Sequence, residues 1–218
     1  MVEKLRSSAN VPNSASPRSG TFGLRYVITG GPGVGKTTVI TELGNLGYTT
    51  LKEVARQIIG EQLPQGILPW TQLAEFQLLV LERQIDLETR IHGQTVFCDR
   101  GVIDGIGYCR EGNIAIPAQL AYEATHHLYT GVFVLDPLDT YYTDTERVED
   151  AQRARTIHDL ITDSYTRAGY DVIRVPVLPP NERVTFILEK IGGTHHDRNT
   201  NIKGSTCTTH APTKKQNQ

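Results

Sequence analysis

Eight consecutive residues, Gly30 to Thr37, constrain this chain more than any others, because they read GGPGVGKT. They fit the pattern G-x-x-x-x-G-K-[ST] and lie between an apolar run at 24–29 and an amphipathic stretch that reaches Leu46. A strand, a glycine-rich loop and a helix in this order turn backbone N–H groups inward and place the positive end of the helix behind them. The pattern predicts a phosphate-binding loop, since a plain glycine-rich turn would not need Lys36.

The residue types of the loop indicate a magnesium nucleotide. Lys36 is expected to reach the β- and γ-phosphates, and the Thr37 hydroxyl to bind Mg²⁺. The expected nucleotide contacts are the loop and the start of its helix: Gly30, Gly31, Pro32, Gly33, Val34, Gly35, Lys36, Thr37 and Thr38. Asp99 closes the apolar run TVFC and is the expected second metal ligand, although an aspartate after a strand also commonly caps a helix. Arg100 follows it and is placed either over the phosphates or in a surface salt bridge.

Short β-branched runs alternate with longer amphipathic runs between residues 24 and 191, which indicates βαβ units on a parallel sheet. Strands are expected at 24–29, 48–51, 95–99, 131–136 and 170–175. Helices are expected after the loop as far as Leu46, and at 53–62, 71–91 and 181–191. The prediction is a three-layer α/β P-loop NTPase fold with a mostly parallel five-stranded sheet.

The two ends, 1–23 and 192–218, are polar and aperiodic, so we expect a disordered leader and a disordered tail around one domain at 24–191. The leader also has the composition of an organelle transit peptide, which is a minor alternative. Hydrophobic residues make up 38% of the chain, and no apolar run approaches the roughly 20 residues of a membrane span, so no membrane insertion is expected. Three scattered cysteines favour a reducing, cytoplasmic location.

The net charge of −2 divides unevenly: +2 over residues 1–23, +3 over 192–218 and −7 over the segment between them. A segment with this much negative charge repels the phosphate backbone of a nucleic acid, so general nucleic-acid binding is not expected. The expected partners are a nucleoside triphosphate and a small-molecule acceptor, with a protein partner left open.

Three classes of P-loop protein compete for this sequence. A GTPase-like switch would need an Asn-Lys-x-Asp segment, which the chain lacks, while the Asp-x-x-Gly match from Asp104 to Gly107 is short enough to be a chance match. An assembly ATPase would need a helical lid domain for which 218 residues leave little room. We therefore favour a kinase that transfers the γ-phosphoryl of ATP to a small hydroxyl-bearing metabolite, with a nucleoside as the first candidate and GTP left open as the donor.

A kinase needs a group beside the acceptor hydroxyl, and the helix expected at 53–62 offers one. Its apolar residues recur at helical spacing, so Glu53 and Arg56 share the opposite face, near the carboxyl end of the preceding strand. Glu53 is expected to accept the proton of the acceptor or orient its hydroxyl, and Arg56 to hold a phosphate or ribose. The equal alternative is an i,i+3 ion pair on a solvated helix.

Residues 140–155 are polar and charged, as expected of a mobile lid that supplies arginines to the transition state. Arg147 precedes the helix of this stretch. On the helical wheel Arg153 flanks the buried stripe and Arg155 points further out. For each arginine the alternative is a position on a solvated charged face with no role in the site.

Two aromatic residues and one cysteine complete the expectations. Trp70 and Phe76 are expected to anchor the long helix in the core, with stacking on a base as the alternative. Cys98 lies in a buried strand and is expected to be inert.

The segments ITGGPGVGKTT, KEVARQIIGEQ, FCDRGVIDGIGY, DTERVEDAQRARTIHDLI, AGYDVIRVP and NERVTFIL, in this order, resemble the NadR-type AAA domain. That group contains nicotinamide riboside kinase domains and a protein of photoreceptor trafficking. The resemblance implies a nucleotide-kinase-like fold with a short helical lid, and magnesium–nucleotide binding. It keeps a nucleotide-binding regulatory module with slow hydrolysis as the alternative function.

The resemblance also implies site residues, carried over position by position. They are Lys36, Thr37, Asp99, Glu53, Arg56, Arg100 and Arg147. Through the run Ala-Arg-Thr-Ile-His it favours Arg155 over Arg153, whereas the helical wheel favours Arg153, so both are retained.

Overall fold

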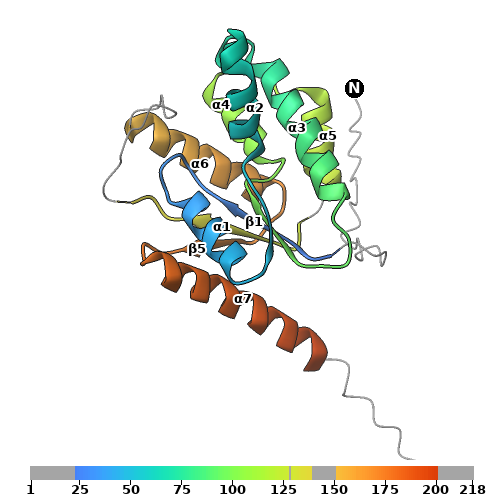
Figure 1. Ribbon diagram of the computed structural model, residues 1–218, viewed down its shortest axis with the longest axis vertical. Coiled ribbons are helices and arrows are strands. Elements are labelled where there is room, and N and C mark those ends of the chain that lie inside the picture. The colour runs from blue at the N-terminus through green and yellow to red at the C-terminus, as the bar shows by residue number, and fades with distance from the viewer. Residues whose placement is uncertain (1–22, 128, 139–150, 201–218) are drawn as a thin grey trace, which may run out of the picture.

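A computed structural model describes residues 23–127, 129–138 and 151–200. Five parallel strands form one sheet in the order β2-β3-β1-β4-β5 (Figure 1). The strands are β1 (Arg25–Thr29), β2 (Thr49–Leu51), β3 (Val96–Asp99), β4 (Gly131–Leu135) and β5 (Val172–Val175). All five lie within the ranges expected from the sequence. Because β1 is central, the loop that follows it begins at the middle of the carboxyl edge, where ligands bind in such sheets.

Seven α-helices are described around this sheet. They are α1 (Lys36–Asn45), α2 (Val54–Gln62), α3 (Leu73–Thr89), α4 (Asp104–Glu111), α5 (Ala118–His126), α6 (Ala151–Arg167) and α7 (Pro180–Thr200), with short 3₁₀ turns η1 (Leu63–Gln65) and η2 (Pro69–Thr71) between α2 and α3. Helix α7 was expected to end at residue 191 but continues to Thr200. Two glycines at 192–193 cost about 1 kcal/mol each without blocking a helix as a proline would.

Helices α4 and α5 were not expected from the sequence. Helix α4 contains Gly105 and Gly107, both poor helix formers. A Cβ on Gly107 would lie 2.6 Å from Ile161 Cγ1 of α6, so the glycine allows the two helices to pack closely. Tertiary packing, which periodicity does not report, therefore outweighs local propensity here.

Alternating side chains of the strands build two cores, one on each face of the sheet. On β1, Tyr26 and Ile28 belong to the cluster that includes Leu43 of α1 and Ile187 of α7. Val27 belongs to the opposite cluster, formed with α3, α4, α5 and α6. Figure 1 shows α7 on one side of the sheet and α2 to α5 on the other. This three-layer arrangement confirms the expected fold class.

Two further properties of the described residues follow from this packing. None of their helices combines the length and apolar character needed to cross a membrane. Cys98 is fully buried in β3, and burial raises the pKa of its thiol well above the ordinary value, in agreement with the expected inertness.

Candidate active site

The loop between β1 and α1 is shaped by three glycines in the left-handed region. Gly30, Gly33 and Gly35 have φ values of +127°, +79° and +89°, which side chains rarely allow. Helix α1 then begins at Lys36, whose Nζ donates hydrogen bonds to the carbonyl oxygens of Gly30 at 3.0 Å and Gly31 at 2.7 Å. The Lys36 ammonium is thus held inside the curve of the loop, at the helix N-terminus.

The Lys36 ammonium is buried among charged groups. Burial and the nearby Arg100 lower the pKa of Lys36 to about 8, while the carboxylates of Glu53 and Asp99 act in the opposite direction. Among the described residues its hydrogen-bond partners are two neutral carbonyls, so its charge is not neutralised by a direct bond. A buried cation in this state has a strong tendency to bind an anion.

Thr37 and Asp99 meet at the carboxyl edge of the sheet. The Thr37 hydroxyl donates to Asp99 Oδ2 at 3.1 Å, and Asp99 Oδ1 is buried without a hydrogen-bond partner among the described residues. Burial raises the pKa of Asp99 to about 6, against the attraction of Lys36. A hydroxyl and a carboxylate with an unsatisfied oxygen are the ligand types that Mg²⁺ prefers, so these residues fit a magnesium ion.

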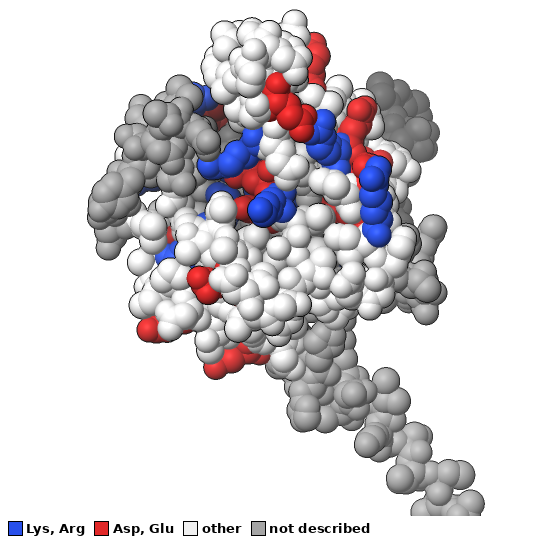
Figure 2. Space-filling view, viewed as in Figure 1, with Lys and Arg blue, Asp and Glu red and all other residues white. Residues whose placement is uncertain are grey.

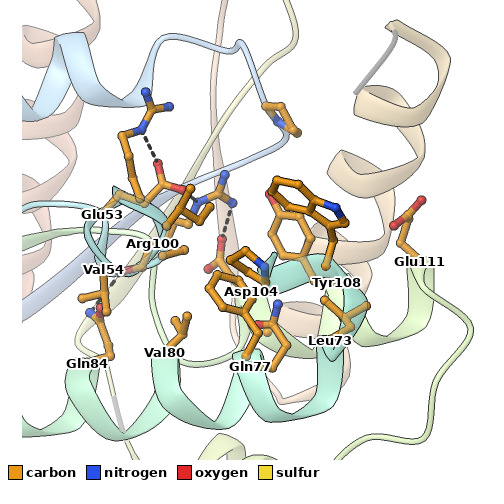
Figure 3. A pocket seen from close by; sticks show the side chains of 18 of the residues that line it. Glu53, Val54, Leu73, Gln77, Val80, Gln84, Arg100, Asp104, Tyr108 and Glu111 are labelled. Carbon is orange, nitrogen blue, oxygen red and sulfur yellow. Dashed lines mark hydrogen bonds and ion pairs between the residues drawn. The ribbon is translucent and has the colours of Figure 1, made fainter. Parts of the chain in front are cut away.

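Arg100 connects this edge to the start of α2. Its Nε donates to Glu53 Oε1 at 2.8 Å, and its Nη1 lies 3.3 Å from Asp104 Oδ1 (Figure 3). Burial by itself would raise the pKa of Glu53, but Arg100, Lys36 and Arg56 outweigh it and hold that pKa below the ordinary value. Glu53 therefore stays a carboxylate at neutral pH, with a buried guanidinium beside it.

The carboxylate of Asp104 organises the turn that carries Arg100. It accepts hydrogen bonds from the Thr29 hydroxyl at 2.6 Å, the Tyr165 hydroxyl at 2.7 Å and the Gly101 N–H at 3.1 Å, in addition to its contact with Arg100. The sequence match that begins at Asp104 was regarded as a chance match. In the structure Asp104 joins β1, α4 and α6 beneath the site, a position that this match did not predict.

Helix α6 also contacts the phosphate-binding loop itself. The Gly31 N–H donates to His158 Nδ1 at 3.1 Å, so Nδ1 carries no proton, and burial lowers the pKa of His158. A Cβ on Gly31 would lie 2.6 Å from the carbonyl oxygen of Ala154. Sequence reasoning missed His158, because its position gives no sign that it faces the loop.

A cavity of about 750 Å³ opens beside the loop and extends between α2, α3 and α4. Lys and Arg side chains gather with acidic ones around a hollow on this face of the molecule (Figure 2). The lining includes residues of the expected site: Gly33, Gly35, Lys36, Thr37, Thr38, Glu53, Arg56 and Arg100. Asp99 lies directly behind Thr37.

Aromatic side chains line the same cavity. Trp70, Phe76 and Tyr108 all contribute to it. Trp70 is 53% exposed, so its expected role as a core anchor was wrong, because the turn η2 places it at the rim and not beneath α3. The lining of this cavity is therefore aromatic in part, as a site for a flat molecule would be.

The arginines expected around the site are placed differently from one another. Arg56 forms the i,i+3 pair with Glu53 at 3.7 Å and is 43% exposed. Arg153 lines the cavity and makes two hydrogen bonds to Glu111, at 2.7 and 3.0 Å. Arg155 lies in a separate, smaller cavity with Pro137, Leu138, His158 and Asp159. Arg147 and residues 139–150 of the expected lid lie outside the described residues.

Comparison with known proteins places the chain in a family. A family model described as an AAA domain matches residues 25–183, in agreement with the expected resemblance. No curated protein matches the chain.

Solved structures share its fold at low sequence identity. Deoxyadenosine kinase from M. mycoides is 16% identical with a TM-score of 0.56, over 78% of this chain and 100% of that one. Thymidylate kinase from Candida albicans is 15% identical with a TM-score of 0.60, over 81% and 94%. NadR protein in complex with NR is 15% identical with a TM-score of 0.56, over 71% of this chain and 44% of that one. At such identity the likeness is one of fold, and that fold is the P-loop nucleotide-kinase fold.

Proposed function

Since the chain belongs to the AAA domain family, we propose that it is an ATP- and magnesium-dependent kinase of a small hydroxyl-bearing metabolite, with a nucleoside as the acceptor. One observation carries the proposal. The buried Lys36 ammonium and the Glu53–Arg100 pair line a single cavity, so a phosphate-binding group and an acceptor-binding group face the same space.

The donor half of the site would bind the triphosphate. Backbone N–H groups of the loop and the Lys36 ammonium would hold the phosphates, and Arg100 would offset negative charge on the transferring group. Thr37 and Asp99 would hold Mg²⁺, which when bound neutralises phosphate charge. Arg147, Arg153 and Arg155 remain the proposed additional cations of the donor side.

The acceptor half would place a hydroxyl against Glu53. The acceptor oxygen forms a bond to the γ-phosphorus while the bond from that phosphorus to the β–γ bridging oxygen breaks, and ADP leaves. The hydroxyl proton passes to the Glu53 carboxylate, which Arg100 keeps ionised and oriented. Arg56, half exposed at the same cavity, would bind the ribose.

ADP release from Mg·ATP tests the proposal, measured for the purified protein alone and with a panel of nucleosides that includes nicotinamide riboside. We expect at least one nucleoside to accelerate turnover. Lys36→Ala should abolish the acceleration, and Glu53→Gln should lower kcat about 10²- to 10⁴-fold while leaving ATP binding intact.

Other outcomes of the same assay contradict the kinase. Tight nucleotide binding with slow hydrolysis that no acceptor changes would favour the alternative, a regulatory module whose nucleotide state controls a protein partner. Equal acceleration in wild type and Lys36→Ala would mean that the turnover comes from a contaminant.

A further inference from the structure

The buried face of α3 carries more polar side chains than a core face usually does. Its buried residues are Gln77, Leu81, Gln84 and Glu88, which recur at helical spacing. Three of these four are polar. Buried polar side chains are almost always hydrogen-bonded, so each of the three should have an identifiable partner.

Gln84 and Glu88 find their partners within the protein. Gln84 Nε2 donates to Glu88 Oε1 at 2.6 Å and reaches the carbonyl oxygen of Arg100 at 3.4 Å. Glu88 also accepts from the Tyr129 hydroxyl at 3.0 Å and lies 2.7 Å from His127 Nε2. The interior end of the polar stripe is therefore satisfied by protein groups.

Gln77 differs from the other two. It is 5% exposed and lines the cavity. Its amide makes no hydrogen bond to another residue that the structure describes, and its polar atoms are not among the fully enclosed ones that lack a partner, so they border the cavity. Gly105 faces it from α4, where an added Cβ would lie 3.0 Å from Gln77 Oε1. Gly105 thus leaves space for the Gln77 amide. A hydrogen-bond partner for this amide can approach from the cavity.

The surroundings of Gln77 restrict the chemistry of that partner. Trp70, Phe76 and Tyr108 line the same cavity, which suits a flat ring. A carboxamide offers one acceptor and two donors in a plane, and it forms two parallel hydrogen bonds with an edge that has a donor next to an acceptor. In Figure 3, Gln77 and Glu53 lie on different parts of the lining with Arg100 between them. A ring bound at Gln77 can therefore carry a sugar that points toward Glu53.

We propose that Gln77 is the residue that selects the acceptor, by pairing its amide with an amide-like edge of the acceptor's ring. This inference rests on the proposed function, since it assigns the ring-binding end of that acceptor site. Nucleosides whose ring presents a neighbouring donor and acceptor are bound, and analogues that lack the donor are rejected.

The single tryptophan of the chain makes the test direct. Trp70 lines the cavity, so its fluorescence reports binding there without any phosphoryl transfer. The ligands are three pairs that differ by one donor group: adenosine and purine riboside, cytidine and pyrimidin-2-one riboside, nicotinamide riboside and nicotinic acid riboside. Each is titrated into the full chain, wild type and Gln77→Leu, with exposed Glu75→Gln on α3 as the matched control.

For at least one ligand pair, we expect the loss of the ligand's donor group and the loss of the Gln77 amide to have strongly non-additive effects on binding. Removing the donor from the ligand, or the amide from Gln77, should each raise Kd at least tenfold, and the two changes together should raise it little further. Glu75→Gln should bind as the wild type does. Equal affinity of wild type and Gln77→Leu for every ligand, or two independent losses that multiply, would overturn the assignment.

Two further measurements distinguish a misfolded variant and a wrong acceptor from a wrong role of Gln77. If Gln77→Leu fails to fold by circular dichroism, the isosteric Gln77→Glu takes its place and should lose the ligands that need its N–H. If no nucleoside changes the Trp70 signal, the acceptor assignment is wrong, whereas ADP release stimulated by another hydroxyl compound would still support a kinase.

Discussion

Arg100 occupies a backbone conformation that non-glycine residues usually avoid. Its φ is +74°, which costs on the order of 1–3 kcal/mol. The surroundings hold it there, since its N–H donates to the Ile28 carbonyl at 3.1 Å and its guanidinium meets Glu53 and Asp104. This conformation turns the Arg100 side chain back toward the site instead of leaving it on the surface.

Asp99 should make stability depend on pH in an unusual direction. Its pKa is raised from 3.8 to about 6, so the folded chain holds this proton more tightly than the unfolded chain does. The stabilisation is complete below about pH 4 and is lost as pH rises through about 6, a change of about 3 kcal/mol. Without Mg²⁺, Asp99→Asn should therefore gain about 2.4 kcal/mol relative to wild type between pH 4 and pH 7, measured by urea unfolding.

Magnesium provides the control for this experiment. At pH 7 added Mg²⁺ should recover stability in the wild type and not in Asp99→Asn, because only the carboxylate can bind the ion. A stability difference between the two proteins that is the same at both pH values would show that Asp99 ionises normally in the folded chain.

At the scale of elements, the contact between the loop and α6 leaves no room at Gly31. A Cβ there would meet the Ala154 carbonyl at 2.6 Å and His158 Cβ at 2.9 Å. Gly31→Ala should cost about 1–3 kcal/mol of stability and weaken ATP binding, because the loop must move. Gly60→Ala in α2, where a Cβ meets nothing within 4 Å, should stabilise by up to about 1 kcal/mol. Thermal unfolding measures the stability of both variants. If Gly31→Ala and Gly60→Ala changed it in the same direction, the close contact between the loop and α6 would be refuted.

Asp104 joins three elements, and its charge is matched to the donors around it. Thr29 and Arg100 donate to one carboxylate oxygen of Asp104, and Gly101 and Tyr165 donate to the other. Asp104→Asn removes the charge and keeps one accepting oxygen, so one of the two donor pairs faces an NH₂ group that cannot accept. We expect a loss of about 2–4 kcal/mol, and about 1 kcal/mol for Tyr165→Phe, which removes one donor only. Denaturant titration measures both. Near-equal losses of stability in the two variants would mean that the contacts of Asp104 with Arg100 and Gly101 do not stabilise the fold.

At the scale of the whole molecule, the site draws on the β1–α1 loop, the ends of β2 and β3, and α6. Because these elements belong to one folded unit, Mg·ATP should stabilise all of it. At 100 times its Kd the gain is about 2.7 kcal/mol, roughly 5–10 °C in Tm for a chain of this size. Lys36→Ala should show no such shift at the same ATP concentration. A shift of equal size in that variant would mean that ATP binds elsewhere.

Much of the element pattern was accessible from the sequence, because period-2 and period-3.6 patterns are local properties. All five strands and the phosphate-binding loop were predicted, and the pairing of Thr37 with Asp99 followed from strand ends that meet at one edge. Helices α4 and α5, the end of α7 and the place of Trp70 were not predicted correctly. Each of these depends on what packs against the segment, as Gly107 against Ile161 illustrates.

The sequence by itself determined the glycine-rich loop and the place of Lys36, which we propose as the phosphate-binding part of the site, since consecutive residues build it without help from distant ones. Only the tertiary structure decided which buried polar groups face one another and which face the cavity. Gln77 and Gln84 lie on the same stripe of α3, yet protein groups satisfy Gln84 and the cavity borders Gln77. The physical reason is that a hydrogen-bond partner belongs to another element, and its distance depends on how the elements pack.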